Sequence, residues 1–130
     1  MSFPFSLATF TIANGANTSN QVFIGDSELV GLLMDPSAWT TAKISCLVSL
    51  DGTNFYPMYD GMGVLIQLGV TTALAAATYI AIGEETNVKF EHFRGVQWLQ
   101  LQSGVPGTTV NQGGARALTG VLRSSRAGSF

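Results

Sequence analysis

The chain has 130 residues, enough for one domain with its own core and too few for two ordinary domains. Charged residues make up 11% of it and hydrophobic residues 46%. Because a small domain has a large surface, so few charges leave much of that surface neutral or apolar, and such surface is normally covered by partners. The composition therefore indicates an oligomer or a component of a larger assembly.

The net charge of −2 conceals an asymmetry along the chain. Residues 1–91 hold all eight acidic residues and two lysines, a net charge of −6, whereas residues 92–130 hold four arginines and no acid, a net charge of +4. Two interpretations remain open: the arginines are solvated or paired residues on strands, or they form a basic edge that docks an acidic partner or a neighbouring copy. Nucleic acid is not an expected partner, because four arginines without interleaved aromatic residues make too small a binding surface.

The N-terminal part of the chain predicts short strands separated by turn residues. Residues 1–5 lack the basic and apolar regions of a secretory signal, so we expect folding in a cytoplasm. Residues 1–8 are expected to form an extended N-terminal segment. Strands are expected over Ala8–Ala13, Gln21–Gly25 and Leu29–Met34. Pro36 cannot donate to a strand ladder and marks the next boundary.

Lys43–Leu50 alternates as a strand that buries one face. Two sets of side chains are expected to lie on opposite faces, Ile44, Cys46, Val48 and Leu50 on one and Lys43, Ser45 and Ser49 on the other. The single cysteine excludes an internal disulfide and is expected to act as a small buried hydrophobe. Asp51-Gly52 predicts a hairpin turn into a returning strand over Asn54–Tyr59.

The stretch from Gly63 to Gly83 carries no charge and has about the length that spans a bilayer. Its apolar residues recur at every second position, as in Val64, Ile66 and Leu68, which is the period of a strand. Acidic residues on both sides also give no orientation for a span. We therefore expect two strands rather than a transmembrane helix.

The C-terminal part predicts strands over Val88–Phe93, Gly95–Gln102 and Arg116–Arg123, with the last closing a sheet. About eight to ten short strands with frequent turns predict an all-β fold, an antiparallel β-sandwich of the jelly-roll or immunoglobulin-like kind. Residues 1–123 are expected to form this single domain, and residues 124–130 a flexible tail.

Residues capable of catalysis or metal binding are sparse. His92 is the only histidine, and a single histidine excludes a zinc site of the common histidine-rich type. His92 itself is expected to be an ordinary strand residue. Asp51 and Asp60 lack the calcium-binding pattern of an EF-hand, and no phosphate-binding glycine motif is present. The sequence therefore predicts no catalytic residue, no metal, no cofactor and no enzymatic activity. An aromatic shelf of Phe55, Tyr56 and Tyr59 near Trp39 could bind a sugar or peptide, although packing in the core is the alternative.

Two regions of the sequence resemble small structural proteins of tailed bacteriophages. The first runs from Ala38 to Asp60 and includes Val48-Ser49-Leu50-Asp51-Gly52-Thr53-Asn54-Phe55. The second runs from Phe93 to Gly104 and continues with Val110-Asn111-Gln112. The chain departs from the pattern at Gln102, where the group often has arginine. The resemblance implies a virion protein, and among virion proteins a capsid decoration (cement) protein.

Such a protein is expected to form a homotrimer, to bind the major capsid protein on the outside of the shell, and to be assembled in the host cytoplasm. A tail, fibre or head-fibre component that binds host glycans is the alternative. Neither nucleic acid nor a membrane is an expected partner. Contacts are expected at the termini, in the loop over 71–78 and at the arginines, namely at Ser2, Phe3, Phe5, Thr71, Thr72, Leu74, Arg116, Arg123, Arg126 and Phe130.

Overall fold

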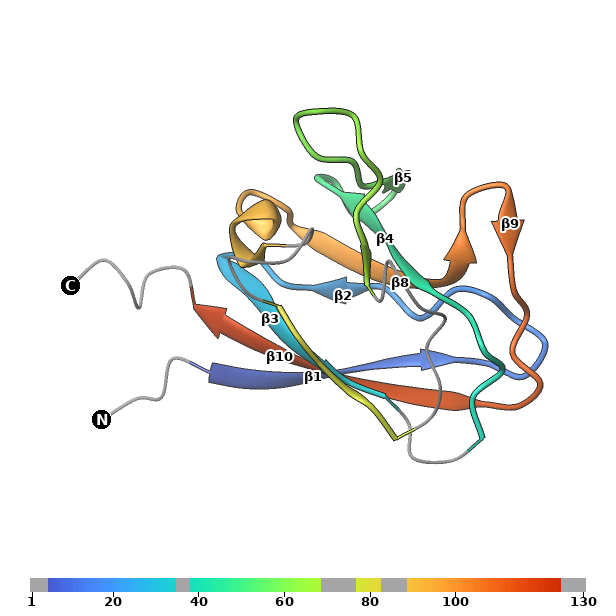
Figure 1. Ribbon diagram of the computed structural model, residues 1–130. Coiled ribbons are helices and arrows are strands. Elements are labelled where there is room, and N and C mark those ends of the chain that lie inside the picture. Colours follow the sequence, from blue (N-terminus) through green and yellow to red (C-terminus); the bar gives the residue numbers. More distant parts are fainter. Residues whose placement is uncertain (1–4, 35–37, 69–76, 83–88, 125–130) are drawn as a thin grey trace.

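The computed structural model describes residues 5–34, 38–68, 77–82 and 89–124, which form two facing β-sheets (Figure 1). The four-stranded sheet has the order β1 (Phe5–Ile12), β10 (Arg116–Ser124), β3 (Ser27–Leu33) and β7 (Tyr79–Ala81). The six-stranded sheet has the order β2 (Val22–Phe23), β8 (Trp98–Val105), β4 (Ile44–Ser49) and β5 (Tyr56–Pro57), while β6 (Gln67–Leu68) also pairs with β4 and β9 (Thr108–Thr109) with β8. One short 3-10 helix, η1 (Phe90–Phe93), precedes β8.

The strand pairing is that of a jelly roll. The pairs run inward from the two ends of the chain: β1 with β10, β2 with β8, β3 with β7, and β4 with β5 and β6. All of these pairs are antiparallel. A long two-stranded ribbon that folds across itself gives this order and distributes its strands over two sheets. The predicted all-β, jelly-roll-like sandwich is confirmed.

The two ends of the described chain lie deeper in the fold than the sequence predicted. β1 begins at Phe5, so residues 5–8 of the expected extended segment belong to a sheet strand. β10 extends to Ser124 and lies between β1 and β3, in the interior of its sheet and not at its closing edge. Residues 125–130 of the predicted tail lie outside the described residues.

The hydrophobic core lies between the two sheets, where alternate residues of each long strand point inward. Core side chains with at most 1% exposure include Phe10 and Ile12 of β1, Leu29 and Leu32 of β3, Ile44 and Cys46 of β4, Leu99 and Leu101 of β8, and Leu118 of β10. Leu29 and Leu32 both point inward, although they are three residues apart, because the pairing with β10 shifts register between them.

The predicted faces of β4 hold only in part. Ile44 and Cys46 are buried as expected, but Leu50 lies beyond the end of the strand and is 77% exposed. Ser45 and Ser49, expected to face away from the core, are also buried. Their burial is possible because both hydroxyls are hydrogen bonded, that of Ser45 to the carbonyl oxygen of Gly104 at 2.9 Å.

The uncharged stretch contains two strands, as predicted. Ile66 and Leu68 are buried around β6, and β7 follows at Tyr79–Ala81, while residues 69–76 lie outside the described part. The part of the chain that the structure describes contains no helix with the length and apolarity that a membrane span requires. The strand predicted over Val88–Phe93 is wrong, since Phe90–Phe93 is η1 and His92 lies in this helix.

Candidate functional site: an exposed apolar sheet face

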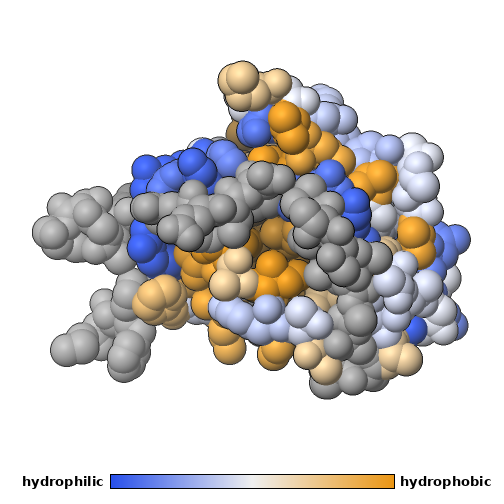
Figure 2. Space-filling model, in the orientation of Figure 1, coloured by the Kyte–Doolittle hydropathy of each residue, from blue (hydrophilic) through white to orange (hydrophobic). Residues whose placement is uncertain are grey.

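The outer face of the four-stranded sheet carries large apolar side chains in contact with solvent. Strand alternation directs Phe5 and Leu7 of β1, Leu33 of β3 and Tyr79 of β7 away from the core, with exposed fractions of 54%, 72%, 45% and 55%. Val121 of β10, half-buried, lies among them. Figure 2 shows hydrophobic residues along the lower edge of the molecule, where this sheet lies in Figure 1. We call these five residues the outer apolar face.

The strand register brings these residues together across the sheet. Leu7 lies opposite Val121, which lies opposite Gly31. Leu33 lies opposite Tyr79, and the ring of Tyr79 reaches diagonally over Gly31, where a Cβ atom would collide with the tyrosine hydroxyl. Gly31 is thus the residue that allows an aromatic ring to lie flat on this face. The outer apolar face is therefore continuous across all four strands.

A buried ion pair closes one end of this face. The side chain of Glu28 is fully buried, and its Oε1 accepts a hydrogen bond from Nε of Arg94 at 2.6 Å. Its Oε2 lies 3.5 Å from Nη2 of Arg123, the residue opposite it on β10. The hydrogen bond and the charge of Glu28 raise the pKa of Arg94. Nε of Arg116 donates to Gln112 Oε1 at 3.2 Å. These three arginines thus have partners within the chain, as the first interpretation of the basic segment expects.

β1 forms one edge of the sheet and is only partly capped. The side chain of Asn20 accepts a hydrogen bond from the backbone N–H of Thr11 at 2.7 Å and donates one to the carbonyl oxygen of Thr9 at 3.3 Å. These bonds show that the N–H and C=O groups of the odd-numbered residues of β1 point away from β10. The role of Asn20 cannot be recognised from the sequence, because it depends on a contact between separate segments.

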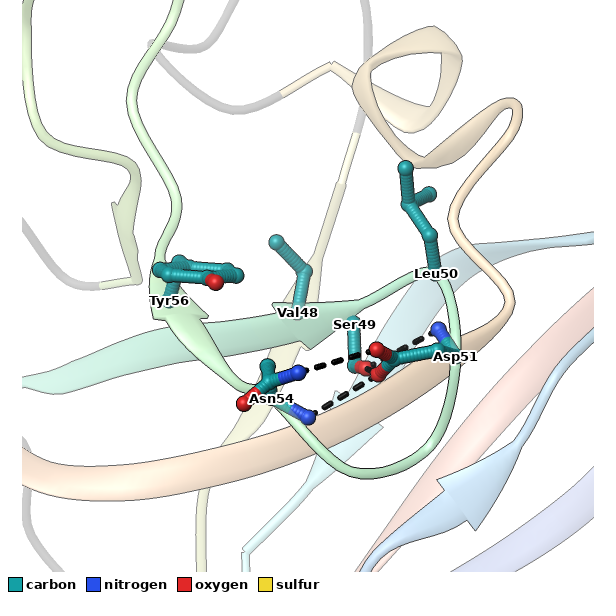
Figure 3. A pocket seen from close by; sticks show the side chains of 6 residues that line it. All are labelled: Val48, Ser49, Leu50, Asp51, Asn54 and Tyr56. Carbon is teal, nitrogen blue, oxygen red and sulfur yellow. Dashed lines mark hydrogen bonds between the residues drawn. The ribbon is translucent and has the colours of Figure 1, made fainter.

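A cavity of about 420 Å³ lies at the β4–β5 hairpin (Figure 3). It is lined by Val48, Ser49, Leu50, Asp51, Asn54 and Tyr56. Figure 3 shows the side chains of Val48, Leu50 and Tyr56 on one side of the hairpin, with Asp51 turned toward Asn54. The cavity is therefore mainly apolar, with its polar groups at one side.

The polar groups of the cavity are engaged in holding the turn. Asp51 Oδ1 accepts hydrogen bonds from the backbone N–H groups of Thr53 and Asn54 at 2.8 and 2.9 Å, and its Oδ2 accepts one from the Asn54 amide at 3.0 Å. These bonds hold the pKa of Asp51 below its ordinary value, and the bond from the Asn54 N–H has the largest effect. Gly52 takes a positive φ of 79° in this turn. Asp60 caps its own turn in the same way, through the N–H groups of Val64 and Met62, which lower its pKa.

The predicted aromatic shelf divides into two parts. Trp39 is buried in the core with 7% exposure, whereas Tyr56 and Tyr59 are 63% and 53% exposed. Phe55 is half-buried. Within the described residues, no three histidine, cysteine, aspartate or glutamate side chains are grouped so that they could hold a metal ion.

The structure describes three of the predicted contact residues, Phe5, Arg116 and Arg123. Phe5 and Arg123 lie opposite each other at the outer apolar face, and Arg116 lies at the other end of β10. The other predicted contacts lie outside the described residues: Ser2, Phe3, Thr71, Thr72, Leu74, Arg126 and Phe130. The prediction missed Leu7, Leu33 and Tyr79. A signal for Leu7 exists in FSLATFTI, where Phe5 and Leu7 have the opposite parity to Phe10 and Ile12 and must therefore occupy the other face.

No protein-family model matches the sequence, and a comparison with curated proteins found no match. Among solved structures, the chain is similar to the crystal structure of SPBc2 prophage-derived protein YomS. The TM-score is 0.49 at 9% sequence identity, over 94% of this chain and 96% of that one. A likeness of this degree establishes neither a family nor a function.

Proposed function

We propose that the protein is a structural component of a phage virion, which binds the outside of the capsid as a homotrimer and stabilises the shell. The observation that carries the proposal is the outer apolar face, which leaves Phe5, Leu7, Leu33 and Tyr79 in solvent on a chain with few charges. The sequence resemblance to structural proteins of tailed phages supports the same function. Its partners are then other copies of the chain and the major capsid protein, and its location is the virion, assembled in the host cytoplasm.

The physical basis is the burial of this surface in the assembled particle. Removing apolar surface from water contributes about 25 cal/mol per Å², and a stable interface buries roughly 800 Å² on each partner. A protein that binds only the assembled, expanded shell stabilises that shell by mass action.

The proposal is tested by adding purified protein to expanded heads that lack decoration. Bound copies per head and the temperature of DNA release are measured against protein concentration. We expect saturable binding in a number related to the capsid lattice, and release at a higher temperature. Absence of saturable binding contradicts the proposal.

A matched pair of variants then tests the surface itself. The double variant Leu7→Ser, Leu33→Ser removes apolar area from the outer apolar face. Met62→Ser removes a side chain that is 89% exposed in a turn elsewhere. We expect the double variant to bind heads at least tenfold more weakly and Met62→Ser to bind as the unaltered protein does. Equal binding by all three proteins would exclude this face as the contact.

Adhesion to host glycans by a tail or fibre component is the second candidate, and the exposed ring of Tyr56 beside the cavity is the observation that favours it. Aromatic rings stack on the apolar faces of sugars. A glycan array with Tyr56→Ala, and with Tyr79→Ala as the matched exposed tyrosine, tests this candidate. Loss of a glycan signal in Tyr56→Ala alone supports it, and no signal with the unaltered protein excludes it.

A further inference from the structure

The open half of the β1 edge offers unpaired backbone groups. The odd-numbered residues of β1 direct their N–H and C=O groups to this edge, and Asn20 occupies those of Thr11 and the carbonyl of Thr9. Within the described residues, β10 is the one strand that pairs along β1, and an isolated bridge joins Ile12 to Ser19 at the far end. The edge-facing groups of Phe5 and Leu7 therefore have no described strand beside them. Backbone groups at such an edge bind another strand readily.

Two further features make this edge suited to a strand of its own kind. β1 contains no charged residue over Phe5–Ile12, so two copies bring no like charges together. Natural sheet edges are usually protected by charge or proline, and this half has neither. The run Phe5-Ser6-Leu7 has a large apolar residue at each end and a small residue at its centre. In an antiparallel pair of two such runs, large residues therefore lie opposite large ones and serine lies opposite serine.

We propose that the β1 edges of two copies pair antiparallel around a two-fold axis centred on Ser6. Phe5 of each copy then lies opposite Leu7 of the other, and each such pair exchanges two N–H···O bonds. Because paired residues share a face, the outer apolar faces of the two copies become continuous, with an aromatic–aliphatic contact across the junction. Asn20 limits the pairing, since its side chain occupies the edge beyond Leu7.

This inference rests on the self-association in the proposed function, but the two-fold contact that it names is separate from the contact within a trimer. A two-fold contact joins copies in pairs. Alone it gives dimers, and beside a separate trimer contact it gives hexamers. The tests of the two-fold contact use the isolated protein. If they fail, the proposed binding to capsids is still tested separately, by adding the protein to undecorated heads.

A backbone variant tests the pairing by sedimentation. Leu7→Pro removes an N–H that points to the free edge and makes no bond within the sheet, and edge strands accept proline at such positions. Leu7→Ala shortens the same side chain but keeps the N–H. We expect Leu7→Pro to raise the dissociation constant of the two-fold contact about a hundredfold, and more than Leu7→Ala does. Equal effects of the two variants would contradict backbone pairing.

A cysteine variant, Ser6→Cys, tests the register of the pairing between the two copies. It gives a result even if Leu7→Pro fails to fold. The two copies of Ser6 form a non-hydrogen-bonded pair with Cα atoms about 4.5 Å apart, within the range that a disulfide spans. Thr9→Cys, on the same strand, places its two copies too far apart. The native Cys46 does not compete, because it is buried and its pKa is raised to about 12.

On mild oxidation, we expect Ser6→Cys to give a covalent dimer in the majority of molecules and Thr9→Cys to give almost none. Equal cross-linking of the two variants, or none in either, would overturn the proposal. A wild-type protein that sediments as a monomer at millimolar concentration would overturn it as well, and would assign the open edge to a strand of another protein.

Discussion

The outer faces of the two sheets are built on different principles. On the six-stranded sheet, polar side chains bond to the chain itself: Ser45 Oγ donates to Gln102 Oε1 at 3.1 Å, and Gln100 Nε2 donates to the carbonyl oxygen of Ser19 at 2.6 Å. On the four-stranded sheet, Leu7 and Tyr79 remain in solvent with more than half of their surface exposed. The polar side chains of the first face thus have partners within one molecule, whereas the second face has the composition of a surface that a partner covers.

The six-stranded sheet also carries a large aromatic pair, which is packed within the chain. Phe23 of β2 lies opposite Trp98 of β8, and their rings meet edge to face with centroids 5.2 Å apart. Each ring covers part of the other, and the indole of Trp98 also lies against Gly52. These two rings therefore pack against each other within the chain, in a geometry that stabilises such pairs, although Phe23 remains 59% exposed.

The largest effect on the fold is expected from the buried glutamate at the end of the apolar face. Glu28→Ala removes the buried carboxylate that both Arg94 and Arg123 contact and should lower the free energy of unfolding by about 3 kcal/mol. Urea denaturation measures the change. Glu91→Ala, on η1, is the control and should change stability by less than about 0.5 kcal/mol. A loss below about 1 kcal/mol for Glu28→Ala would show that the ion pair does not support this face.

A smaller loss is expected at Gln112, a buried residue that joins separate segments of the chain. Gln112 is buried, and its amide bonds both the N–H and the carbonyl oxygen of Thr40, each at 2.9 Å, and the hydroxyl of Ser103 at 2.8 Å. Gln112→Ala leaves these groups unpaired and should cost about 2 kcal/mol.

Thermal or urea unfolding measures this cost, with Gln21→Ala, an exposed glutamine, as the control. A neutral Gln112→Ala variant would mean that water replaces the amide.

Acid should weaken the β4–β5 turn. The pKa of Asp51 is held below its ordinary value by the backbone N–H groups of Asn54 and Thr53. Its contribution to stability is therefore complete above the unfolded-state pKa, about 4, and is lost as pH falls from there toward the lower folded-state pKa. Asp51→Asn cannot titrate and should lose less stability between about pH 4 and pH 2. Urea midpoints at pH 7, 4 and 2 measure this, and equal losses in both proteins would contradict it.

The inner faces of the strands could be predicted from the sequence because alternation is a local property. Leu99 and Leu101 of β8 are fully buried, as their spacing indicates. The burial of Ser45 could not be predicted, because it depends on Gln102 and Gly104, more than fifty positions away. The 3-10 helix η1 could not be predicted either, because four residues are too few to show a helical pattern in the sequence.

The candidate site was predictable only at its edge. Phe5 was identified as a contact residue from its place near the terminus. The sequence places Leu33 and Tyr79 in apolar strands, but it does not show which face of each strand meets solvent, because that depends on the strand order. That order arises from pairings such as β3 with β7, whose residues are nearly fifty positions apart.

The smallest effect on the fold, and the sharpest test of the contrast, is expected at Leu33. This side chain is 45% exposed on the outer apolar face, while its neighbour Leu32 is fully buried on the other side of the strand. Leu33→Ser should change the free energy of unfolding by less than about 0.5 kcal/mol and weaken association with partners. Leu32→Ser should destabilise the monomer by more than about 2 kcal/mol. Urea denaturation and sedimentation on both variants separate the two effects. If Leu33→Ser unfolded as readily as Leu32→Ser, the outer face would be part of the monomer's own packing, and its exposure could no longer indicate a partner.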